Sequence, residues 1–233
     1  MRWIACLLLA AVATLECREE RLRPAPKIEG EARGAPSASA RALALPAPAL
    51  SGSVSFEQAL AARRSRREFA PTPLSIAELG QLAWAAQGIT DRAQGFRTAP
   101  SAGALYPLEL YFVTSAGVLH YVPQSHAFEQ RSNRDLRREL SRAALDQEAL
   151  RLAACDIVIT SVTARTRKKY GERATRFVAI EAGHVAQNLL LQATARGLVG
   201  VPIGGMDDDA VSGVLNLGPA QEPLYMVAIG HSR

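Results

Sequence analysis

Residues 174–205 read ATRFVAIEAGHVAQNLLLQATA, then RG, then LVGVPI, then GG, and this succession sets the expected fold. Five side chains recur at helical spacing through the first part: Phe177, Ile180, His184, Asn188 and Leu191. Gly197 follows where a helix would end, and Leu198 to Ile203 is a short apolar run typical of a strand. We therefore expect a long helix over 174–195 and a strand directly after it. On the apolar face of that helix, His184 is expected to be a packed histidine.

The rest of the chain alternates between the same two kinds of element. Ser55 is a helix cap for a short helix with Phe56, Ala59 and Leu60 on one face, and Ser75 to Glu78 is a capping box for a helix that ends at Gly88. Further helices are expected at 135–145, 147–154 and 207–215, and strands at 108–114, 118–122, 157–162 and 224–229. This order predicts an α+β fold with a mostly antiparallel central sheet flanked by helices.

Composition narrows the class of protein. The chain has 233 residues, of which 48% are hydrophobic and 21% charged, which favours one globular domain with tails and excludes wholesale disorder. Aromatic residues make up only 6%, too few for a protein that stacks on single-stranded nucleic acid. A net charge of +5 suits an anionic cofactor or substrate better than a nucleic-acid duplex.

The N-terminus has the pattern of a processing segment. The apolar run from Trp3 to Leu15 is too short to span a membrane but fits the core of a secretory signal, so residues 1–16 are predicted to be a signal peptide. The protein would then be exported, periplasmic or secreted, with a membrane anchor only if Cys17 is lipidated. The alternative is a cytoplasmic protein whose first residues are no functional signal. Residues 17–52 are predicted to be a Pro/Ala-rich linker and 53–233 the folded domain.

Metal and disulfide chemistry find little support in the sequence. The histidines His120, His126, His184 and His231 show no pair spacing, so no metal site is expected. Two of the three cysteines, Cys6 and Cys17, lie near the N-terminus, and Cys155 begins an apolar strand. No disulfide framework is therefore predicted for the core.

Three segments could carry chemistry. Arg63 to Phe69 reads RRSRREF, and clustered guanidinium groups bind phosphate through paired donors, although the same pattern is also typical of a solvated basic surface. Arg97 to Pro107 is rich in small residues, which let a backbone approach a flat ligand. Gly200 to Asp207 places paired glycines before a helix, where backbone N–H groups can point at a ligand. Neither a phosphate-binding loop motif nor a dinucleotide fingerprint is present.

Taken in this order, the segments resemble the FMN-dependent nitroreductase family, and most closely its SagB/ThcOx-type dehydrogenase branch. The resemblance covers about Phe56 to His231. After the Arg-Ser segment, its motifs stand here as Ser101 to Pro107, Lys169 to Arg173, Glu181 to Leu189 and Ile203 to Gly205. It implies FMN bound between two subunits of a homodimer. One departure is Ala104, which stands where classical nitroreductases carry an asparagine.

The resemblance also implies roles for particular residues. Arg63, Ser65 and Arg67 would hold the FMN phosphate, its ribityl chain and one edge of the ring, with Arg64 beside them and Arg233 as a further phosphate contact. The flavin would be lined by Pro100, Ser101, Ala102, Gly103 and Gln187, and by the backbone of Gly204 and Gly205. Lys169 and Tyr170 match a pair that, in relatives oxidising azolines to azoles in peptides, supplies the base; the alternative is a basic surface strip.

The function expected from these residues is hydride transfer through flavin N5, with a small-molecule or peptide substrate and NAD(P)H as a candidate electron donor. The alternative is an exported, non-catalytic binding or scaffold protein that keeps the fold. Flavin bound to the purified protein would support the enzyme over the non-catalytic protein.

Overall fold

The computed structural model describes residues 42–233, so the predicted signal peptide, Cys17 and most of the predicted linker lie outside the described residues. A seven-stranded sheet runs in the order β1-β6-β5-β4-β7-β9-β8, and every neighbouring pair is antiparallel. Its strands are β1 (Ala42–Ala44), β4 (Leu108–Thr114), β5 (Gly117–Val122), β6 (Ala127–Ser132), β7 (Cys155–Ser161), β8 (Leu198–Ile203) and β9 (Glu222–His231). A small hairpin of β2 (Ile89–Asp91) and β3 (Phe96–Arg97) stands apart from it. The predicted α+β fold with an antiparallel sheet is confirmed.

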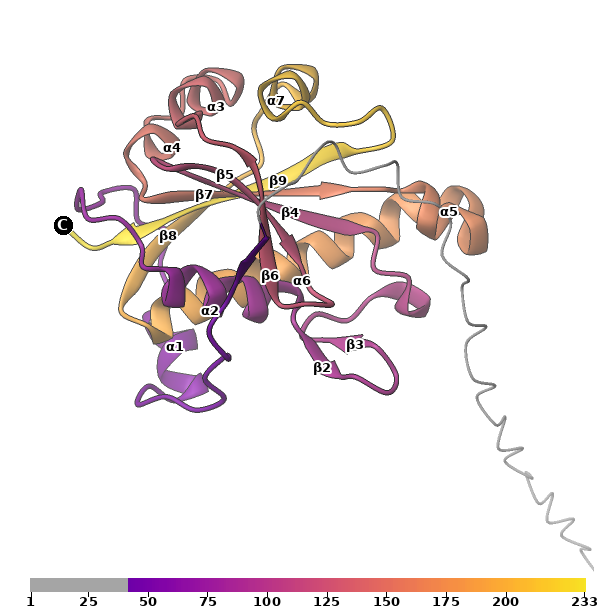
Figure 1. The fold of residues 1–233 in the computed structure, drawn as a ribbon, viewed down its shortest axis with the longest axis horizontal. Helices are drawn as coiled ribbons and strands as arrows, with labels where there is room; N and C mark the ends of the chain where they lie inside the picture. Colours follow the sequence, from indigo (N-terminus) through magenta and orange to yellow (C-terminus); the bar gives the residue numbers. More distant parts are fainter. Residues whose placement is uncertain (1–41) are drawn as a thin grey trace, which may run out of the picture. The chain divides into compact units, whose positions relative to one another are not determined.

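Helices cover both faces of the sheet (Figure 1). On one face lie α2 (Ile76–Gln87) and the long α6 (Ala174–Ala195), and on the other α3 (Arg137–Ala143), α4 (Glu148–Leu152) and α7 (Asp208–Leu215). The remaining helices are α1 (Phe56–Ala62), which packs on α6, and α5 (Ala164–Tyr170), which joins β7 to α6 through a short 3-10 turn at Gly171–Arg173. No helix among residues 42–233 is long and apolar enough to cross a bilayer.

Two hydrophobic cores lie between these layers, because strand residues alternate between the faces of the sheet. Leu110 and Phe112 point into the core with α2 and α6, whereas Tyr111 and Val113 point into the core with α3, α4 and α7. The central strand β7 is buried along its whole length. This two-sided burial explains why Ile157, Val158 and Ile159 are apolar in succession rather than alternating with polar residues.

The local signals at helix ends are confirmed. The Ser75 hydroxyl accepts the Glu78 N–H while the Glu78 carboxylate accepts the Ser75 N–H, and Ser55 and Gln58 form the same reciprocal cap for α1. Helix α6 and strand β8 have the bounds expected from the sequence.

The predicted buried faces of two helices are wrong. In α1 only Ala59 is buried, while Phe56 and Leu60 are exposed. In α6 the expected face is also turned outward, since His184 is exposed and Ile180 is 46% exposed. The helix instead buries a row of smaller residues, Val178, Ala182, Val185, Ala186, Leu189 and Ala193. Small side chains let α6 lie close to the sheet and to α2. The spacing of the larger apolar residues did not indicate that this row of small residues would form the buried face.

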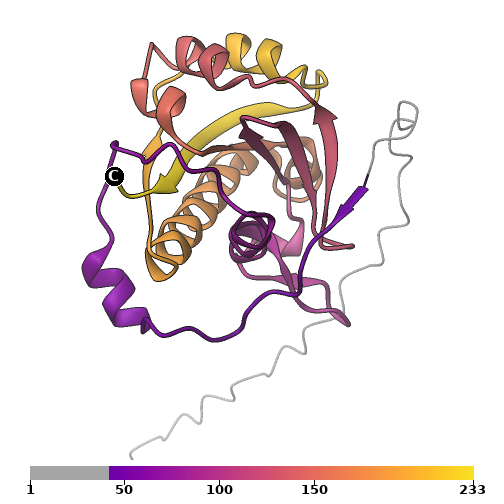
Figure 2. The same ribbon diagram turned by 60° about the vertical axis from the view of Figure 1, so that its left-hand side comes forward.

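The predicted linker ends earlier than residue 52. Strand β1 pairs with β6 at the edge of the sheet, and Leu45 donates its N–H to the His126 carbonyl at 3.2 Å. The Ala49 N–H donates to the side-chain oxygen of Gln81 at 2.8 Å. These contacts are made by backbone groups, so the Pro/Ala-rich composition did not indicate them. Figure 2 shows this stretch running around the outside of the domain to α1.

Asp156 is a polar residue without a partner inside the second core. It lies on β7 at 0% exposure, and neither carboxyl oxygen has a hydrogen-bond partner. Burial raises the pKa of Asp156 well above its usual range, and the nearby Arg137 opposes this only in part. The folded protein therefore binds this proton more tightly than the unfolded chain does. The free energy of unfolding should fall as pH rises above the ordinary aspartate pKa.

Asp156→Val is expected to stabilise the protein at neutral pH by about 1–3 kcal/mol, because it removes an unpaired buried carboxyl and places a β-branched residue in a central strand. Urea unfolding between about pH 4 and pH 8 measures this, and the downward slope of the wild type should flatten in the variant. Glu172→Gln, at an exposed site away from Asp156 and Arg137, is the control. An unchanged slope in Asp156→Val would contradict the assignment.

Candidate active site

The turn between β3 and β4 has an unusual backbone. Residues Ala102–Ala104 form a 3-10 turn, and positive φ angles occur at Gly103 (65°), Ala104 (53°) and Tyr106 (46°). Glycine adopts this region freely, but a non-glycine residue there costs about 1–3 kcal/mol and keeps the conformation only where its surroundings hold it. The small-residue segment picked out in the sequence is therefore a strained turn that neighbouring residues must hold in place.

Lys169 and Tyr170 close over this turn. A Cβ atom added to Gly103 would lie 2.9 Å from Lys169 Nζ and 2.9 Å from Tyr170 Oη, so a larger residue at 103 would displace the ends of both side chains. Lys169 is exposed and Tyr170 is half-buried, and Lys169 Nζ lies 5.5 Å from the centre of the Tyr170 ring. The structure thus brings the two predicted base residues to the predicted flavin-lining turn, although the two segments lie far apart in the sequence. The pair has an amine and a phenol at one open position, which suits proton transfer.

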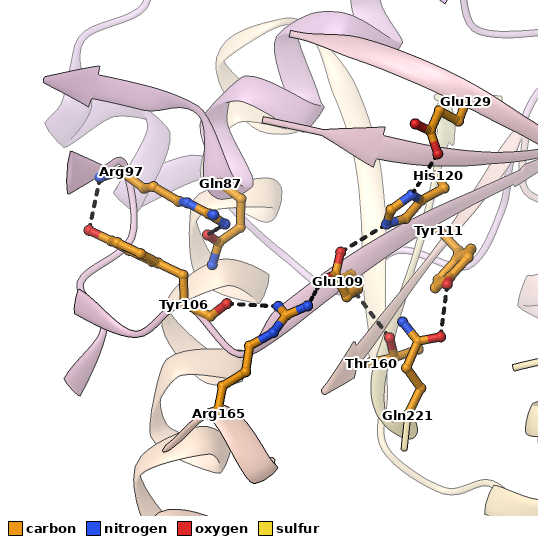
Figure 3. A network of polar contacts seen from close by, with 10 residues as sticks. All are labelled: Gln87, Arg97, Tyr106, Glu109, Tyr111, His120, Glu129, Thr160, Arg165 and Gln221. Carbon is orange, nitrogen blue, oxygen red and sulfur yellow. Dashed lines mark hydrogen bonds and ion pairs between the residues drawn. The ribbon is translucent and has the colours of Figure 1, made fainter. Parts of the chain in front are cut away.

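Helix α5 is fixed to the turn by Arg165. Its guanidinium donates to the Tyr106 carbonyl at 3.2 Å and forms an ion pair with Glu109 at 2.6 Å (Figure 3). At the other end of α5, the Tyr170 ring packs edge-on against Phe177 with ring centres 4.9 Å apart. Both ends of α5 are therefore anchored, which sets the place of Lys169 and Tyr170 over Gly103.

A chain of charges runs from Arg165 into the sheet. Glu109 on β4 binds His120 on β5 at 2.8 Å, and His120 lies 3.7 Å from Glu129 on β6 (Figure 3). Burial would raise the pKa of Glu109, but the hydrogen bond with His120 and the ion pair with Arg165 together lower it. Glu109 is thus a carboxylate that anchors α5 through Arg165.

A second network of polar side chains, from Arg97 through Gln87 to Glu181, supports the turn. Arg97 donates to the Gln87 side-chain oxygen at 2.9 Å, and Gln87 donates to Glu181 on α6 at 3.3 Å. The Arg97 guanidinium lies 4.4 Å from the centre of the Tyr106 ring. Burial raises the pKa of Glu181, against the hydrogen bonds from Ser101 and Gln87 and the charge of Arg97. Glu181 begins the fourth sequence motif, yet no role was predicted for it.

The arginine segment lies elsewhere, along the open edge of β8. Ser65 forms a parallel bridge with Gly200, and the Arg66 N–H donates to the Gly200 carbonyl at 3.0 Å. Arg64 and Arg66 line a pocket of about 270 Å³ beside the end of α6, and Arg64 donates to the carbonyls of Ala61 and Arg63. Alternation along an extended segment places the other three side chains, Arg63, Ser65 and Arg67, on the opposite side. Arg64 is thereby separated from the residues with which the sequence grouped it.

The C-terminus joins the same end of β8. Phe69 bridges to Ser232, and the Ala70 N–H donates to the His231 carbonyl. Arg233 follows directly and is exposed. Pairing therefore brings the C-terminus beside Phe69 and Ala70, which directly follow the arginine segment, and a contact of Arg233 with the phosphate stays a prediction.

Gly204 and Gly205 extend β8 past its last ladder pair, Ile203 with Met226. Both are exposed, so their backbone N–H groups lie beyond the sheet. The following helix α7 is capped by Asp207, whose side chain accepts the Ala210 N–H at 2.9 Å. A ligand at this position would therefore meet the backbone N–H groups of the two glycines, because Asp207 already caps the N-terminus of α7.

The predicted cofactor residues fall into two groups. Gly204 lies about 13 Å along β8 from Gly200, so the arginine segment and the glycine pair share one strand edge. The Ser101 turn lies at the start of β4, three strand spacings or about 14 Å across the sheet from β8. Between the two groups, Gln187 is exposed on α6, and Asn188 donates to the Thr98 carbonyl at 3.4 Å. One protomer does not bring all the predicted flavin residues together.

Among residues 42–233, no group of three or more histidine, cysteine or acidic side chains is placed to hold a metal ion.

An antiparallel sheet between helices, a strand edge with arginines and paired glycines, and a small-residue turn under a Lys–Tyr pair define an α+β protein of the flavin-dependent oxidoreductase class. The chain belongs to the nitroreductase family, whose model matches residues 60–231.

Individual relatives agree with this assignment. Protein MJ1384 of Methanocaldococcus jannaschii, described as a candidate nitroreductase, is 37% identical over 183 residues, which are 76% of this chain and 91% of that protein. The microcin B17-processing protein McbC of Escherichia coli is 30% identical over 157 residues, 62% of this chain and 57% of that protein. A crystal structure of a candidate nitroreductase from Ralstonia eutropha superposes with a TM-score of 0.77 at 29% identity, over 88% of this chain and 96% of that one.

Proposed function

We propose that the protein is an FMN-dependent oxidoreductase that transfers a hydride from one substrate to another through flavin N5. The observation that carries this proposal is the convergence of Lys169 and Tyr170 on Gly103, at a turn of small residues. FMN would supply the hydride acceptor, and the chain would supply orientation, charge and a proton acceptor.

The residues present fit FMN. The strand edge of β8 offers arginines and a serine at one end and free backbone donors at Gly204 and Gly205 at the other. A phosphate suits the paired donors of Arg63 and Arg67, and a flat ring suits exposed glycine backbone.

On the turn, Ser101 accepts the Tyr106 N–H at 2.9 Å, so its hydroxyl is directed into the protein. Contacts with a flavin from this turn would then come from the backbone at Ala102 and Gly103 and from Pro100.

Purification of the protein tests the proposal directly. The full chain should retain, or take up from solution, a flavin with the absorbance bands of FMN, and dithionite should bleach them. A protein that binds no FMN at micromolar concentrations would support the alternative of a non-catalytic binding or scaffold protein.

Within this class, we propose a SagB/ThcOx-type dehydrogenase. The relationship to McbC, a microcin-processing protein, and the presence of Lys169 beside Tyr170 support it. The substrate would be a small molecule or a peptide, and NAD(P)H is the candidate donor if the reaction runs as a reduction. We also propose export through residues 1–16, with membrane attachment only if Cys17 is lipidated.

The separation of the two residue groups supports a homodimer. A flavin bound along β8 of one protomer lies about 14 Å across the sheet from the Ser101 turn of the same protomer. A second copy could bring its own turn to that flavin. Helix α6 has an exposed face suited to such an interface, with Ile180, Gly183, His184 and Gln187.

Ile180→Glu together with Gln187→Glu is expected to convert the dimer to monomer and to lower FMN affinity at least tenfold, because charge would be buried at the interface and half of each site lost. Sedimentation velocity with simultaneous detection of protein and flavin absorbance measures both. Glu148→Lys, on the far face of the sheet, is the charge-change control. A wild-type protein that sediments as an FMN-loaded monomer would rule out the shared site.

A further inference from the structure

We propose that Glu181 is a positioning residue that holds both ends of the Ser101–Tyr106 turn, through Ser101 on one side and through Gln87 and Arg97 on the other. The inference rests on the proposed function only in its last step, the effect of the turn on bound FMN.

The two ends of the turn meet the same buried group. Ser101 Oγ accepts the Tyr106 N–H at 2.9 Å, which leaves the Ser101 hydroxyl proton to be donated to Glu181. Tyr106 is held by Arg97, whose backbone N–H donates to Tyr106 Oη at 3.1 Å and whose guanidinium covers the ring. Arg97 in turn reaches Glu181 through Gln87. Glu181 is only 2% exposed, so water does not compete for these bonds.

The direction of each hydrogen bond requires an acceptor at position 181. An arginine can only donate, so Gln87 must present its oxygen to Arg97 and its amide NH₂ to Glu181. Ser101 also donates to Glu181, because an ionised carboxylate has no proton to donate. A carboxylate accepts both donors with its two oxygens. A glutamine would offer one oxygen, so one of the two donors, the Gln87 amide or the Ser101 hydroxyl, would face an NH₂ group instead.

The turn needs this support because its backbone is strained. Ala104 and Tyr106 hold positive φ angles that such residues adopt only when their surroundings impose them. Gly103, directly before Ala104, carries the contact with Lys169 and Tyr170. If the turn relaxes, that contact and the backbone surface offered to a flavin both change.

Exchanging the two side chains at positions 87 and 181 tests this role of Glu181 directly. In Glu181→Gln the network loses one acceptor, whereas Gln87→Glu with Glu181→Gln restores it. The carboxylate introduced at position 87 would accept from Arg97 and from the amide introduced at position 181. The oxygen of that amide would accept from Ser101, and the total charge would stay the same. Amide hydrogen exchange of the apo protein reports on the turn without any cofactor, through the Tyr106 N–H that Ser101 accepts.

We expect Glu181→Gln to speed exchange of the Tyr106 amide by about tenfold or more, while exchange at Ile157–Ile159 in β7 stays unchanged. In the FMN-loaded protein, the same variant should shift the flavin absorbance bands and slow flavin reduction about tenfold. The reversed double variant should return all three readouts to within about threefold of wild type. Gln192→Ala, which breaks a 3.1 Å bond to Gln81 between the same two helices, should leave the Tyr106 amide unaffected.

Unchanged Tyr106 exchange in Glu181→Gln, or a double variant as impaired as the single one, would overturn the positioning role. If the wild type binds no FMN, the proposed function fails, yet the exchange data still decide whether Glu181 holds the turn.

Discussion

Alanine at Arg63 or at Arg67 is expected to weaken FMN binding about 10- to 150-fold in each single variant, from the loss of about 1.5–3 kcal/mol per charged hydrogen-bonding group. The structure places these two side chains with Ser65 on one side of an extended segment at the edge of β8. A phosphate group gains most from such a row, because each guanidinium can donate two bonds to it. Fluorescence titration of the apo protein with FMN measures the affinity.

Arg66→Ala is the matched control for this prediction. It removes the same charge from the same segment, but Arg66 lines the pocket on the other side, beside Thr194 and Ser232. Its FMN affinity should change less than about threefold. Unchanged affinity in both the Arg63 and Arg67 variants would refute the phosphate assignment. An equal loss in all three would mean that the segment acts through its overall charge and not through particular contacts.

The fold was predictable because its signals are local. The capping boxes at Ser55 and Ser75, the helix from Ala174 to Ala195 and the apolar run of β7 each depend on neighbouring residues in the sequence. Strand β6 was not predicted, since its last four residues, EQRS, are polar and the strand lies near the edge of the sheet. Strand β1 was missed for a related reason, because backbone pairing with β6 needs no particular side chains.

The candidate site was predictable only in its parts. The Lys169–Tyr170 pair and the Ser101 turn were identified separately, and nothing in the sequence indicated that they meet at Gly103. The supporting residues Gln87, Arg97, Glu109 and Arg165 were missed, since each is an ordinary polar residue until the fold brings it to its partner. The acidic first residue of the Glu181 motif was the one available signal. A glutamate among apolar helix residues suggests a buried acceptor, as the structure now shows.

Lys169→Ala combined with Tyr170→Phe is expected to slow flavin reduction by an azoline-containing substrate about 100- to 10,000-fold, the usual effect of removing a general base. Oxidation of a carbon–nitrogen ring to its aromatic form releases a hydride and a proton. FMN takes the hydride alone, so a group of the protein must accept the proton. Lys169 Nζ and Tyr170 Oη are the titratable atoms that lie over the exposed backbone of Gly103.

Stopped-flow bleaching of the flavin absorbance by a thiazoline or oxazoline peptide measures this rate, and the spectrum of the bound FMN before mixing shows whether the site is intact. Arg167→Ala is the control, because it removes an exposed cation from the same helix without touching Gly103. The double variant should keep its FMN spectrum and lose the rate, while Arg167→Ala keeps both. Normal oxidation by the double variant would remove the pair from the mechanism.

The same two variants also separate the dehydrogenase from a nitro- or quinone-reducing enzyme. Reduction of such acceptors with NAD(P)H draws its protons from solvent and needs no base at Gly103, so the double variant should then turn over at close to the wild-type rate. Loss of FMN from the double variant would give a third assignment, in which Lys169 and Tyr170 hold the cofactor. Because the pair contacts a turn about 14 Å across the sheet from β8, that loss would also argue that the flavin of one protomer is covered by the turn of the other.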